Sequence, residues 1–320
     1  MRAGIASSSP RRQRGAALLT AMIIVTLVAT LAAAMVWQQW RAVQVEAAER
    51  ARAQAAWILS GALDFAKLIL KNDRKTYTAL TEPWATPLAE SRLSTFLAID
   101  KSNADDGPEA FLSGNISDAQ ARYNLNNLLT QDFKPDSEQI AILSHICEAV
   151  GIETGIAARI ATGLSSANGT NSAGPLKPNS VSQLTWLGLD HASAEALKPY
   201  VILLNRGALL NVNTASKEVL AAVTGVDEGT AANLLQVRQR TPFKDLPAFA
   251  TAAGKSSDST FMTFLRARAT VHSDHFEVRG RLRLVDRVLV ERTLLRRSTN
   301  NANFEVLERE RVASLEQVGG

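Results

Sequence analysis

The feature that most constrains this chain is an uncharged run of 22 residues, Ala16 to Trp37, which follows a short basic leader. As a helix rising about 1.5 Å per residue, the run is roughly 33 Å long, enough to cross the hydrocarbon core of a bilayer. No Pro or Gly occurs from Ala16 to Ser60, so the helix is expected to continue past the membrane. The run therefore predicts an anchor that the working protein keeps.

Two kinds of discarded signal are the alternatives. The small residues Ala32 to Ala34 resemble a secretory cleavage site, and the pair Arg11 and Arg12 resembles a twin-arginine signal. The unbroken helix argues against the first, and the Arg and Gly that follow the pair argue against the second. Residues 1–15 hold four arginines and no acid, which predicts that the N-terminus stays in the cytoplasm and the rest of the chain lies outside.

Beyond the membrane the helix is expected to become an amphipathic stem over residues 38–72. A continuous helix from Ala16 to about Asn72 is roughly 85 Å long. A coiled coil is the alternative at this spacing, but the later strands offer a sheet to cover the stripe. Small and apolar residues recur at alternating spacings of three and four, namely Ala48, Ala51, Ala55, Ile58, Ala62, Phe65 and Ile69.

The boundary at Gly15, between the basic leader and the helix that begins AALLT, resembles the type III signal of type IV pilins and pseudopilins. This resemblance implies that prepilin peptidase cleaves between Gly15 and Ala16 and methylates the new N-terminus at Ala16. Most members of that family have glutamate at the fifth mature position, where this chain has Thr20. Among the pseudopilins of type II secretion, the K subunit is the one that lacks it.

The absence of a carboxylate at position 20 has a physical interpretation. A carboxylate inside the bilayer costs on the order of 2.5–3.5 kcal/mol and is normally kept only where it has a partner. In the family, that partner is the N-terminal amine of the subunit ahead in the filament. A subunit at the filament tip has no subunit ahead of it, so Thr20 marks a position specific to the tip.

Strands are expected on both sides of a long middle section. The stretch Ala110 to Asn126 predicts two short strands around a turn at Gly114 and Asn115, and Phe304 to Val312 predicts a last strand. Phe264 to Arg297 alternates, with Phe276, Val278, Gly280, Leu282 and Leu284 on one face and Glu277, Arg279, Arg281 and Arg283 on the other.

The middle section contains an internal repeat. Three decapeptides begin 37 residues apart, each with a glycine and, two residues later, an acid: Gly151 with Glu153, Gly188 with Asp190, and Gly225 with Asp227. Each follows an apolar stretch, which predicts helix, tight turn and helix. An asparagine motif also recurs, as NLNNL from Asn124 and NVNTA from Asn211. Repeats of this size indicate stacked units that share a core.

These units resemble helix-hairpin-helix and SAM-like modules, and NVNTASKEVLAAVTGV resembles the helix-hairpin-helix of bacterial DNA-uptake proteins. A membrane-anchored DNA-binding protein is therefore the main alternative. The acid in each turn argues against it, because a carboxylate repels phosphate. Without residues 1–15, the chain has 31 basic and 31 acidic side chains. No nucleic acid is expected as a partner, because the exported part lacks a net positive charge.

Other chemistry has little support. His145 and Cys147 lie on a predicted helix without a third catalytic group, and a single cysteine excludes an internal disulfide. His272, Asp274, His275 and Glu277 are zinc candidates on neighbouring strand positions, where they point to opposite faces. Weak calcium candidates lie in the loop DKSNADDGPE, where a solvated acidic loop is the preferred interpretation; they are Asp100, Asp105, Asp106 and Glu109.

The sequence thus predicts an α+β protein with the type IV pilin-like fold, interrupted by an inserted all-α domain. The resemblance implies a non-enzymatic minor pseudopilin without cofactors, single-pass in a bacterial inner membrane, at the tip of a type II secretion pseudopilus. Its expected partners are the I and J subunits and the prepilin peptidase, with secreted exoproteins as further candidates. The expected divisions are leader 1–15, membrane helix 16–37, stem 38–72, first part of the head 73–126, inserted helices 127–206, second helical unit 207–255 and C-terminal strands 256–320.

Overall fold

The computed structural model describes residues 13–73, 76–94, 110–169, 174–284, 287–298 and 303–312. The chain divides into two compact units, Met1–Ile58 and Leu59–Gly320. One helix, α1 (Gln13–Asn72), runs through 60 residues and includes the whole predicted membrane helix and stem. Within the described residues, its N-terminal part has an 18-residue window of mean hydropathy 2.4 with no side chain buried. By length and composition this helix is able to cross a membrane.

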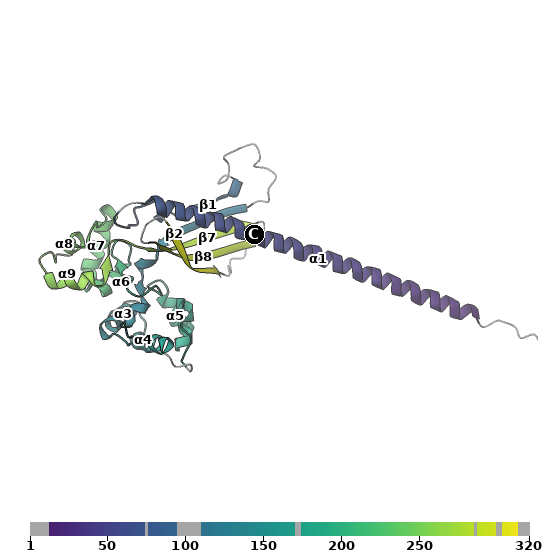
Figure 1. Ribbon diagram of the computed structural model, residues 1–320, viewed down its shortest axis with the longest axis horizontal. Coiled ribbons are helices and arrows are strands. Elements are labelled where there is room, and N and C mark those ends of the chain that lie inside the picture. Colours follow the sequence, from purple (N-terminus) through teal and green to yellow (C-terminus); the bar gives the residue numbers. More distant parts are fainter. Residues whose placement is uncertain are drawn as a thin grey trace, which may run out of the picture. The chain divides into compact units, whose positions relative to one another are not determined.

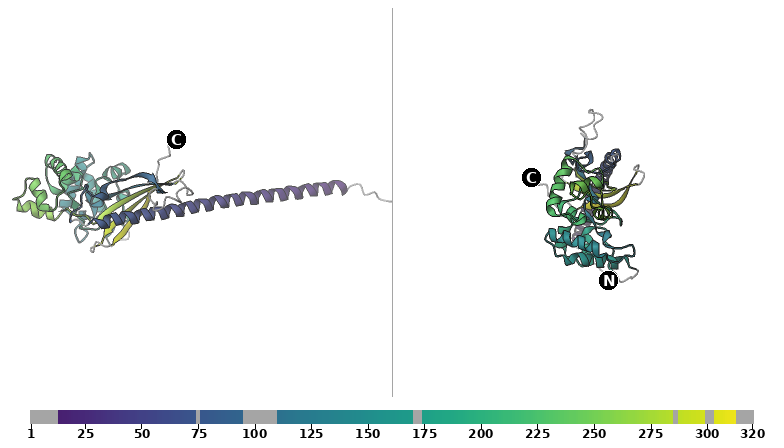
Figure 2. Two further views of the ribbon diagram at one scale, coloured as in Figure 1. Left: turned by 90° about the horizontal axis from the view of Figure 1, so that it is seen from above. Right: turned by 90° about the vertical axis from the view of Figure 1, so that its left-hand side faces the viewer.

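The second unit is built on a five-stranded antiparallel sheet (Figure 1). The C-terminal part of α1, from Leu59 onward, lies along one face of this sheet (Figure 2). A short 3-10 helix, η1 (Pro83–Ala85), adds the buried Trp84 to the core between them. The strand order is β1-β2-β7-β8-β9, with bounds β1 Leu88–Arg92, β2 Ala110–Asp118, β7 His275–Leu284, β8 Arg287–Arg297 and β9 Phe304–Val312.

The stem packs on the sheet by a different stripe from the one predicted. Leu63, Ala66 and Leu70 are at most 5% exposed and contact Phe276 and its neighbours, whereas Phe65 is 44% exposed. The buried stripe is thus displaced by one residue from Ala62 and Phe65, while Ile69 of the predicted stripe is partly buried and packs against the same core. Leucines and alanines make the apolar arc of this helix wide, so periodicity alone does not decide which half of it meets the sheet.

The predicted turn at Gly114 and Asn115 is wrong, because both residues lie in the middle of the continuous strand β2. Gly114 is in register with Gly280 of β7, and a Cβ added to Gly114 would lie only 2.6 Å from the carbonyl oxygen of Arg279. The glycine therefore permits a close approach of two strands, which a Gly-Asn pair does not distinguish from a turn in the sequence. The predicted alternation of β7 and the last strand Phe304–Val312 are both confirmed.

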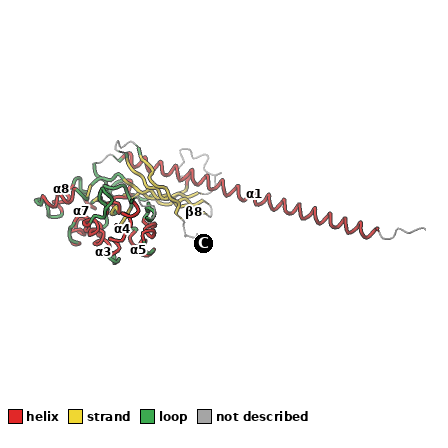
Figure 3. The backbone as a smooth tube through the Cα atoms, turned by 60° about the horizontal axis from the view of Figure 1, so that its bottom comes forward, coloured by secondary structure: helices red, strands yellow, loops and turns green. Residues whose placement is uncertain are grey.

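The chain forms two helical segments between β2 and β7, two strands that pair directly with each other in the sheet. Figure 3 shows the helices of these segments gathered beside the strands. The first segment runs between β3 (Tyr123–Asn124) and β4 (Val201–Ile202), which pair in parallel. After η3 (Ala119–Ala121) and β3, it comprises η4 (Leu125–Leu128), α3 (Ser137–Ala149), α4 (Gly155–Asn168), η5 (Val181–Leu187) and α5 (His191–Leu197).

The second segment runs between β5 (Leu210–Asn211) and β6 (Ala269–Thr270), which also pair in parallel. One continuous apolar core joins both segments. Part of the range predicted to be strand is helical, because Asp258 caps a last helix whose Leu265 is buried. The helices of the second segment are α6 (Lys217–Thr224), α7 (Glu228–Arg240), α8 (Leu246–Ala252) and α9 (Ser259–Arg266).

Gly114→Ala is expected to lower the free energy of unfolding by about 1–3 kcal/mol, because the added methyl overlaps the backbone of β7. The matched control is Gly61→Ala on α1, where a Cβ meets no atom within 4 Å. That change is expected to be neutral or stabilising by up to about 1 kcal/mol. Urea unfolding of the full chain in detergent measures both. Equal stability of the two variants would contradict the close approach of β2 and β7.

The face of the sheet that points away from α1 has a charged network around Glu277. Its carboxylate forms ion pairs with the guanidinium groups of Arg122 at 2.8 Å and Arg292 at 3.4 Å. Arg292 also forms an ion pair with Glu310 at 2.7 Å. Burial alone would raise the pKa of Glu277, but the two guanidinium groups outweigh it and lower this pKa below the ordinary range. A carboxyl group whose pKa is lowered by folding stabilises the fold fully at pH values above its unfolded pKa of about 4.3. This stabilisation is lost as the pH falls through the pKa of the folded state.

Glu277→Gln is therefore expected to cost about 1–2 kcal/mol of unfolding free energy at pH 7, and this difference should shrink as the pH falls below about 4. Glu305→Gln is the control, because the ion pair of Glu305 with Arg296 has a carboxylate side chain 56% exposed. Chemical denaturation at a series of pH values measures both. A pH-independent loss in Glu277→Gln would mean that packing, not charge, stabilises this network.

Candidate functional site

The anchor part of α1 satisfies its own polar groups. The hydroxyl of Thr20 donates to the carbonyl oxygen of Ala16 at 2.8 Å, and Thr26 and Thr30 make similar bonds to preceding turns. Gly15 and Ala16 both lie within α1, which begins at Gln13. Position 20 therefore places no unsatisfied polar group and no charge on this apolar surface.

The three repeated glycines end helices in the left-handed conformation. Their φ angles are 72° at Gly151, 87° at Gly188 and 70° at Gly225, values that glycine adopts without the steric cost of a Cβ. Gly188 follows the 3-10 helix η5, while Gly151 and Gly225 lie just past α3 and α6. Each glycine thus turns the chain sharply between two packed elements.

The acids of the three turns have two different roles. Asp190 accepts a hydrogen bond from the backbone N–H of Ser193, and Asp227 accepts from the backbone N–H and the hydroxyl of Thr230. The hydroxyl of Thr230 lowers the pKa of Asp227 because it binds the ionised form. Glu153 caps no helix and instead pairs with Arg159 at 2.9 Å.

These caps bear on the nucleic-acid alternative. The carboxylates of Asp190 and Asp227 each accept a hydrogen bond from a backbone N–H at the N-terminus of a helix. A phosphate would otherwise approach the helix at this position. The carboxylates of these two turns therefore cap their own helices, in addition to repelling a phosphate.

The two asparagine motifs hold the entrances of the two helical segments. The side-chain amide of Asn124 donates to the carbonyl oxygen of Asn205 at 2.9 Å, and its oxygen accepts from the N–H of Leu204 at 3.0 Å. The side-chain amide of Asn213 donates to the carbonyl oxygen of Phe243, and its oxygen accepts from the N–H of Phe243, both at 2.9 Å. These four hydrogen bonds join residues 30 to 81 positions apart, so the motifs tie the start of a segment to its later parts.

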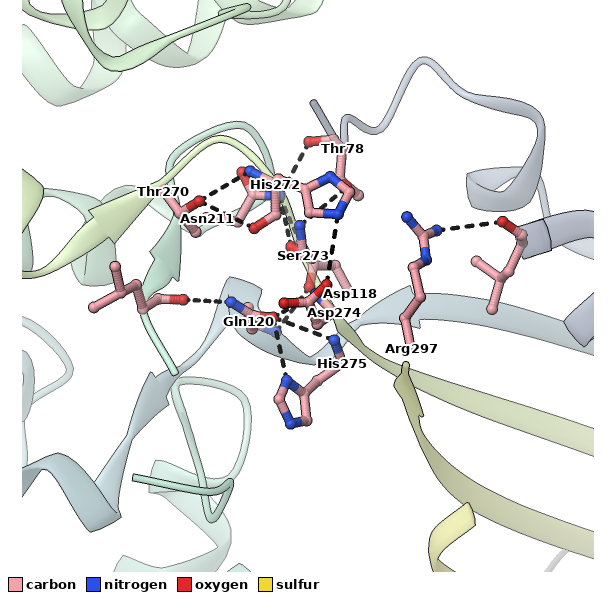
Figure 4. Close-up of polar contacts among 12 residues, drawn as sticks. Thr78, Asp118, Gln120, Asn211, Thr270, His272, Ser273, Asp274, His275 and Arg297 are labelled. Carbon is pink, nitrogen blue, oxygen red and sulfur yellow. Dashed lines mark hydrogen bonds and ion pairs between the residues drawn. The ribbon is translucent and has the colours of Figure 1, made fainter. Parts of the chain in front are cut away.

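The centre of the head is a buried carboxylate, Asp118, at the end of β2 (Figure 4). It accepts hydrogen bonds from Asn211 at 2.8 Å, from the hydroxyls of Thr214 and Ser273 at 2.6 Å each, and from the N–H of Gln120 at 2.8 Å. Burial raises the pKa of Asp118, and these four donors oppose that rise. One side chain thus joins the sheet to both ends of the second helical segment.

Gln120 extends this junction. Its amide group donates to the carbonyl oxygen of Leu209 at 2.8 Å and its oxygen accepts from the N–H of Asp274 at 2.7 Å (Figure 4). Asn211 also reaches the carbonyl oxygen of Thr78 at 3.0 Å. We define Asp118, Gln120, Asn211, Thr214 and Ser273 as the junction cluster. Of these, Asn211 and Thr214 lie in the sequence motif NVNTA, whereas Asp118, Gln120 and Ser273 have no local pattern that predicts their role.

The zinc candidates have separate roles in this region. His275 packs beside Gln120, where burial lowers the pKa of its imidazole, and Glu277 pairs with Arg122. His272 lies 3.5 Å from Asp274. Across the residues that the structure describes, no group of three or more His, Cys, Asp and Glu is suited to hold a metal ion.

The other candidate residues are also accounted for. Cys147 is buried in the helical core, where burial raises the pKa of its thiol to about 11, while His145 is exposed. This pair therefore has neither the shared surface nor the thiolate that a cysteine nucleophile needs. The calcium candidates Asp100, Asp105, Asp106 and Glu109 lie outside the described residues.

Asp118→Asn is expected to lower the free energy of unfolding by about 2–3 kcal/mol, because the new amide donor faces groups that already donate. Asp132→Asn, on an exposed loop, should change it by less than about 0.5 kcal/mol. Thermal and urea unfolding of the full chain in detergent give both values. Wild-type stability in Asp118→Asn would show that the junction cluster does not depend on an acceptor at this position.

The second helical segment, together with β5 before it, is the part of the chain that matches a family model. The family is "Type II secretion system (T2SS), protein K", and residues 210–268 match. The chain is 29% identical over 267 residues to type II secretion system protein K of Pseudomonas aeruginosa, covering 75% of this chain and 76% of that protein. It is also 29% identical over 298 residues to the Klebsiella pneumoniae protein of the same name, covering 83% of this chain and 86% of that protein.

A solved structure shares the fold. A chain of the GspK-GspI-GspJ complex from the enterotoxigenic Escherichia coli type 2 secretion system superposes with a TM-score of 0.64 and 21% identity, covering 83% of this chain and 99% of that chain. The apolar helix and the antiparallel sheet that its C-terminal part covers define a pseudopilin. More particularly, its similarity to type II secretion system protein K over 75% and 83% of its length identifies it as a minor pseudopilin of type II secretion.

Proposed function

We propose that this chain initiates or caps the tip of a type II secretion pseudopilus, which serves the export of folded proteins across the outer membrane. In this proposal it is a single-pass protein of the bacterial inner membrane with a cytoplasmic N-terminus and a periplasmic head. The basic leader and the exposed apolar part of α1 support that topology.

The observation that carries the tip position is Thr20. Its hydroxyl bonds to the preceding turn of its own helix, so it does not seek a partner on another subunit. A shaft subunit of the resembled family has at this position a carboxylate that needs the amine of the subunit ahead. A tip subunit still offers its own N-terminal amine to the subunit behind, which requires cleavage between Gly15 and Ala16 by prepilin peptidase, with methylation of Ala16.

The head supports an end position by its size. Two helical segments are inserted between β2 and β7 and share one core with each other. We class them as an inserted domain of SAM-like, helix-hairpin-helix repeats, on the basis of the turns at Gly151, Gly188 and Gly225. A head enlarged in this way fits poorly around every subunit of a thin helical filament but has room at its end.

The partners we propose are the I and J minor pseudopilins, by analogy with the complex of GspK, GspI and GspJ that shares the fold. Exported proteins that reach the tip are further candidates. We propose no catalytic role and no cofactor, and we do not expect binding to nucleic acid, because Asp190 and Asp227 occupy the helix N-termini of two hairpins.

The experiment is to overproduce the major subunit, vary the amount of this protein, and measure filament length and secretion together. A tip component should be needed in small amounts and should shorten the filaments when in excess. Thr20→Glu should impair insertion or assembly by up to a few kcal/mol, because its carboxylate has no partner in the bilayer. Thr20→Val is the matched control and should be nearly silent.

The proposal fails if this protein is found along the shaft in amounts equal to the major subunit. It also fails if Thr20→Glu assembles and secretes as well as Thr20→Val, since a subunit ahead would then be available to pair with the new carboxylate.

A further inference from the structure

A cleft of about 620 Å³ lies where the two helical segments meet. Its walls come from the first segment through Tyr123 and Gln139 and from the second through Val223 and Arg268, and Arg206 lies on the connection between them. This volume is in the range of cavities that enclose ligands. None of the five residues of the junction cluster lines the cleft, so the cleft is a separate feature of the head.

The charge of the cleft distinguishes it from the rest of the exported chain. Its described lining residues include two arginines, Arg206 and Arg268, and no aspartate or glutamate. The chain without residues 1–15 has equal numbers of basic and acidic side chains. A concave surface with a single sign of charge favours a ligand of the opposite sign.

Both arginines are held in place. The guanidinium of Arg206 lies 4.3 Å from the ring centre of Phe133 and donates to the carbonyl oxygen of Thr130 at 2.7 Å. The guanidinium of Arg268 lies 3.8 Å from the ring centre of Phe264. Ordered cations lose less conformational entropy when a ligand binds.

Neither arginine is fully neutralised. In the part of the chain that the structure describes, no carboxylate lies within ion-pair distance of Arg206. Arg268 pairs with Glu138; the arginine side chain is 11% exposed and the glutamate side chain 74%, so solvent screens the carboxylate of the pair more than the guanidinium. A carboxylate ligand would therefore gain attraction from both cations.

The remaining lining favours a polypeptide over a nucleic acid. The side-chain amides of Gln131 and Gln139 can pair with backbone groups, and Leu129 and Val223 offer apolar contact. The rings of Phe133 and Phe264 are already covered by arginine, and Tyr123 is 3% exposed. No aromatic face among the described lining residues is thus open for stacking with a base, which single-stranded nucleic acid requires.

We propose that this cleft binds an acidic segment of another protein, with its carboxylates between Arg206 and Arg268. The proposal goes beyond the tip function and does not depend on it.

The test uses the full chain in detergent and a fluorescein-labelled hexapeptide of alternating glutamate and alanine. Fluorescence anisotropy should show saturable binding that weakens as salt rises from 50 to about 500 mM. Peptides with glutamine or lysine in place of glutamate, and a single-stranded oligonucleotide, are the comparison probes. Arg206→Gln should remove most of the binding, while Arg240→Gln, an exposed arginine outside the cleft, should leave it unchanged.

Substitutions that add a charge at Ala267 separate an effect on binding from an effect on folding. Ala267 lines the cleft and is exposed, so either substitution is compatible with the fold. Ala267→Lys should tighten binding of the acidic peptide about threefold to tenfold, and Ala267→Glu should weaken it by a similar factor. Equal unfolding midpoints for the two variants show that the fold is unchanged.

The proposal is overturned if the glutamate peptide binds no better than the glutamine peptide. Equal affinities in Ala267→Lys and Ala267→Glu overturn it as well, because the site would then lie elsewhere. Tighter binding of the oligonucleotide than of the acidic peptide would overturn it too, because the ligand of the cleft would then be a nucleic acid. Each of these results leaves the tip function open, since that rests on filament length and Thr20.

Discussion

The architecture of the head depends on one buried carboxylate. Asp118 ends the strand β2, and the chain then leaves the sheet for the two helical segments before it returns at β7. The donors to Asp118 come from the entrance of the second segment, through Asn211 and Thr214, and from its exit, through Ser273. Because a buried acceptor is costly unless it is fully paired, this arrangement fixes where both ends of the segment attach.

The two helical segments repeat one design for leaving and rejoining the sheet. Each is bounded by a pair of two-residue parallel strands, and each begins with an asparagine motif that bonds to distant backbone groups. A two-residue strand pair contributes little by itself, so the asparagines supply the specificity. This design lets a pilin-like sheet carry a large insert without a change in its own strand order.

The helix caps at the repeated turns bear on the nucleic-acid alternative. Helices lie on both sides of the turns at Gly151 and Gly225. In this chain, the carboxylates of Asp190 and Asp227 cap the helices that follow them, by accepting hydrogen bonds from backbone N–H groups of the first turn. The helix N-termini at Asp190 and Asp227 are thus capped from within the chain, whereas Glu153 in the remaining turn pairs with Arg159 instead.

The sequence by itself determined the elements that rest on local pattern. It predicted the continuous helix α1, the alternating strand β7, the last strand β9 and the positions of the turn glycines, because periodicity and left-handed turns leave local signals. Only the tertiary structure decided the features that depend on distant partners. The stripe of α1 that meets the sheet, the role of Gly114 and the junction cluster all required neighbours that no local pattern specifies. Asp118 and Asn211 are 93 positions apart, so folding alone brings them within hydrogen-bonding distance.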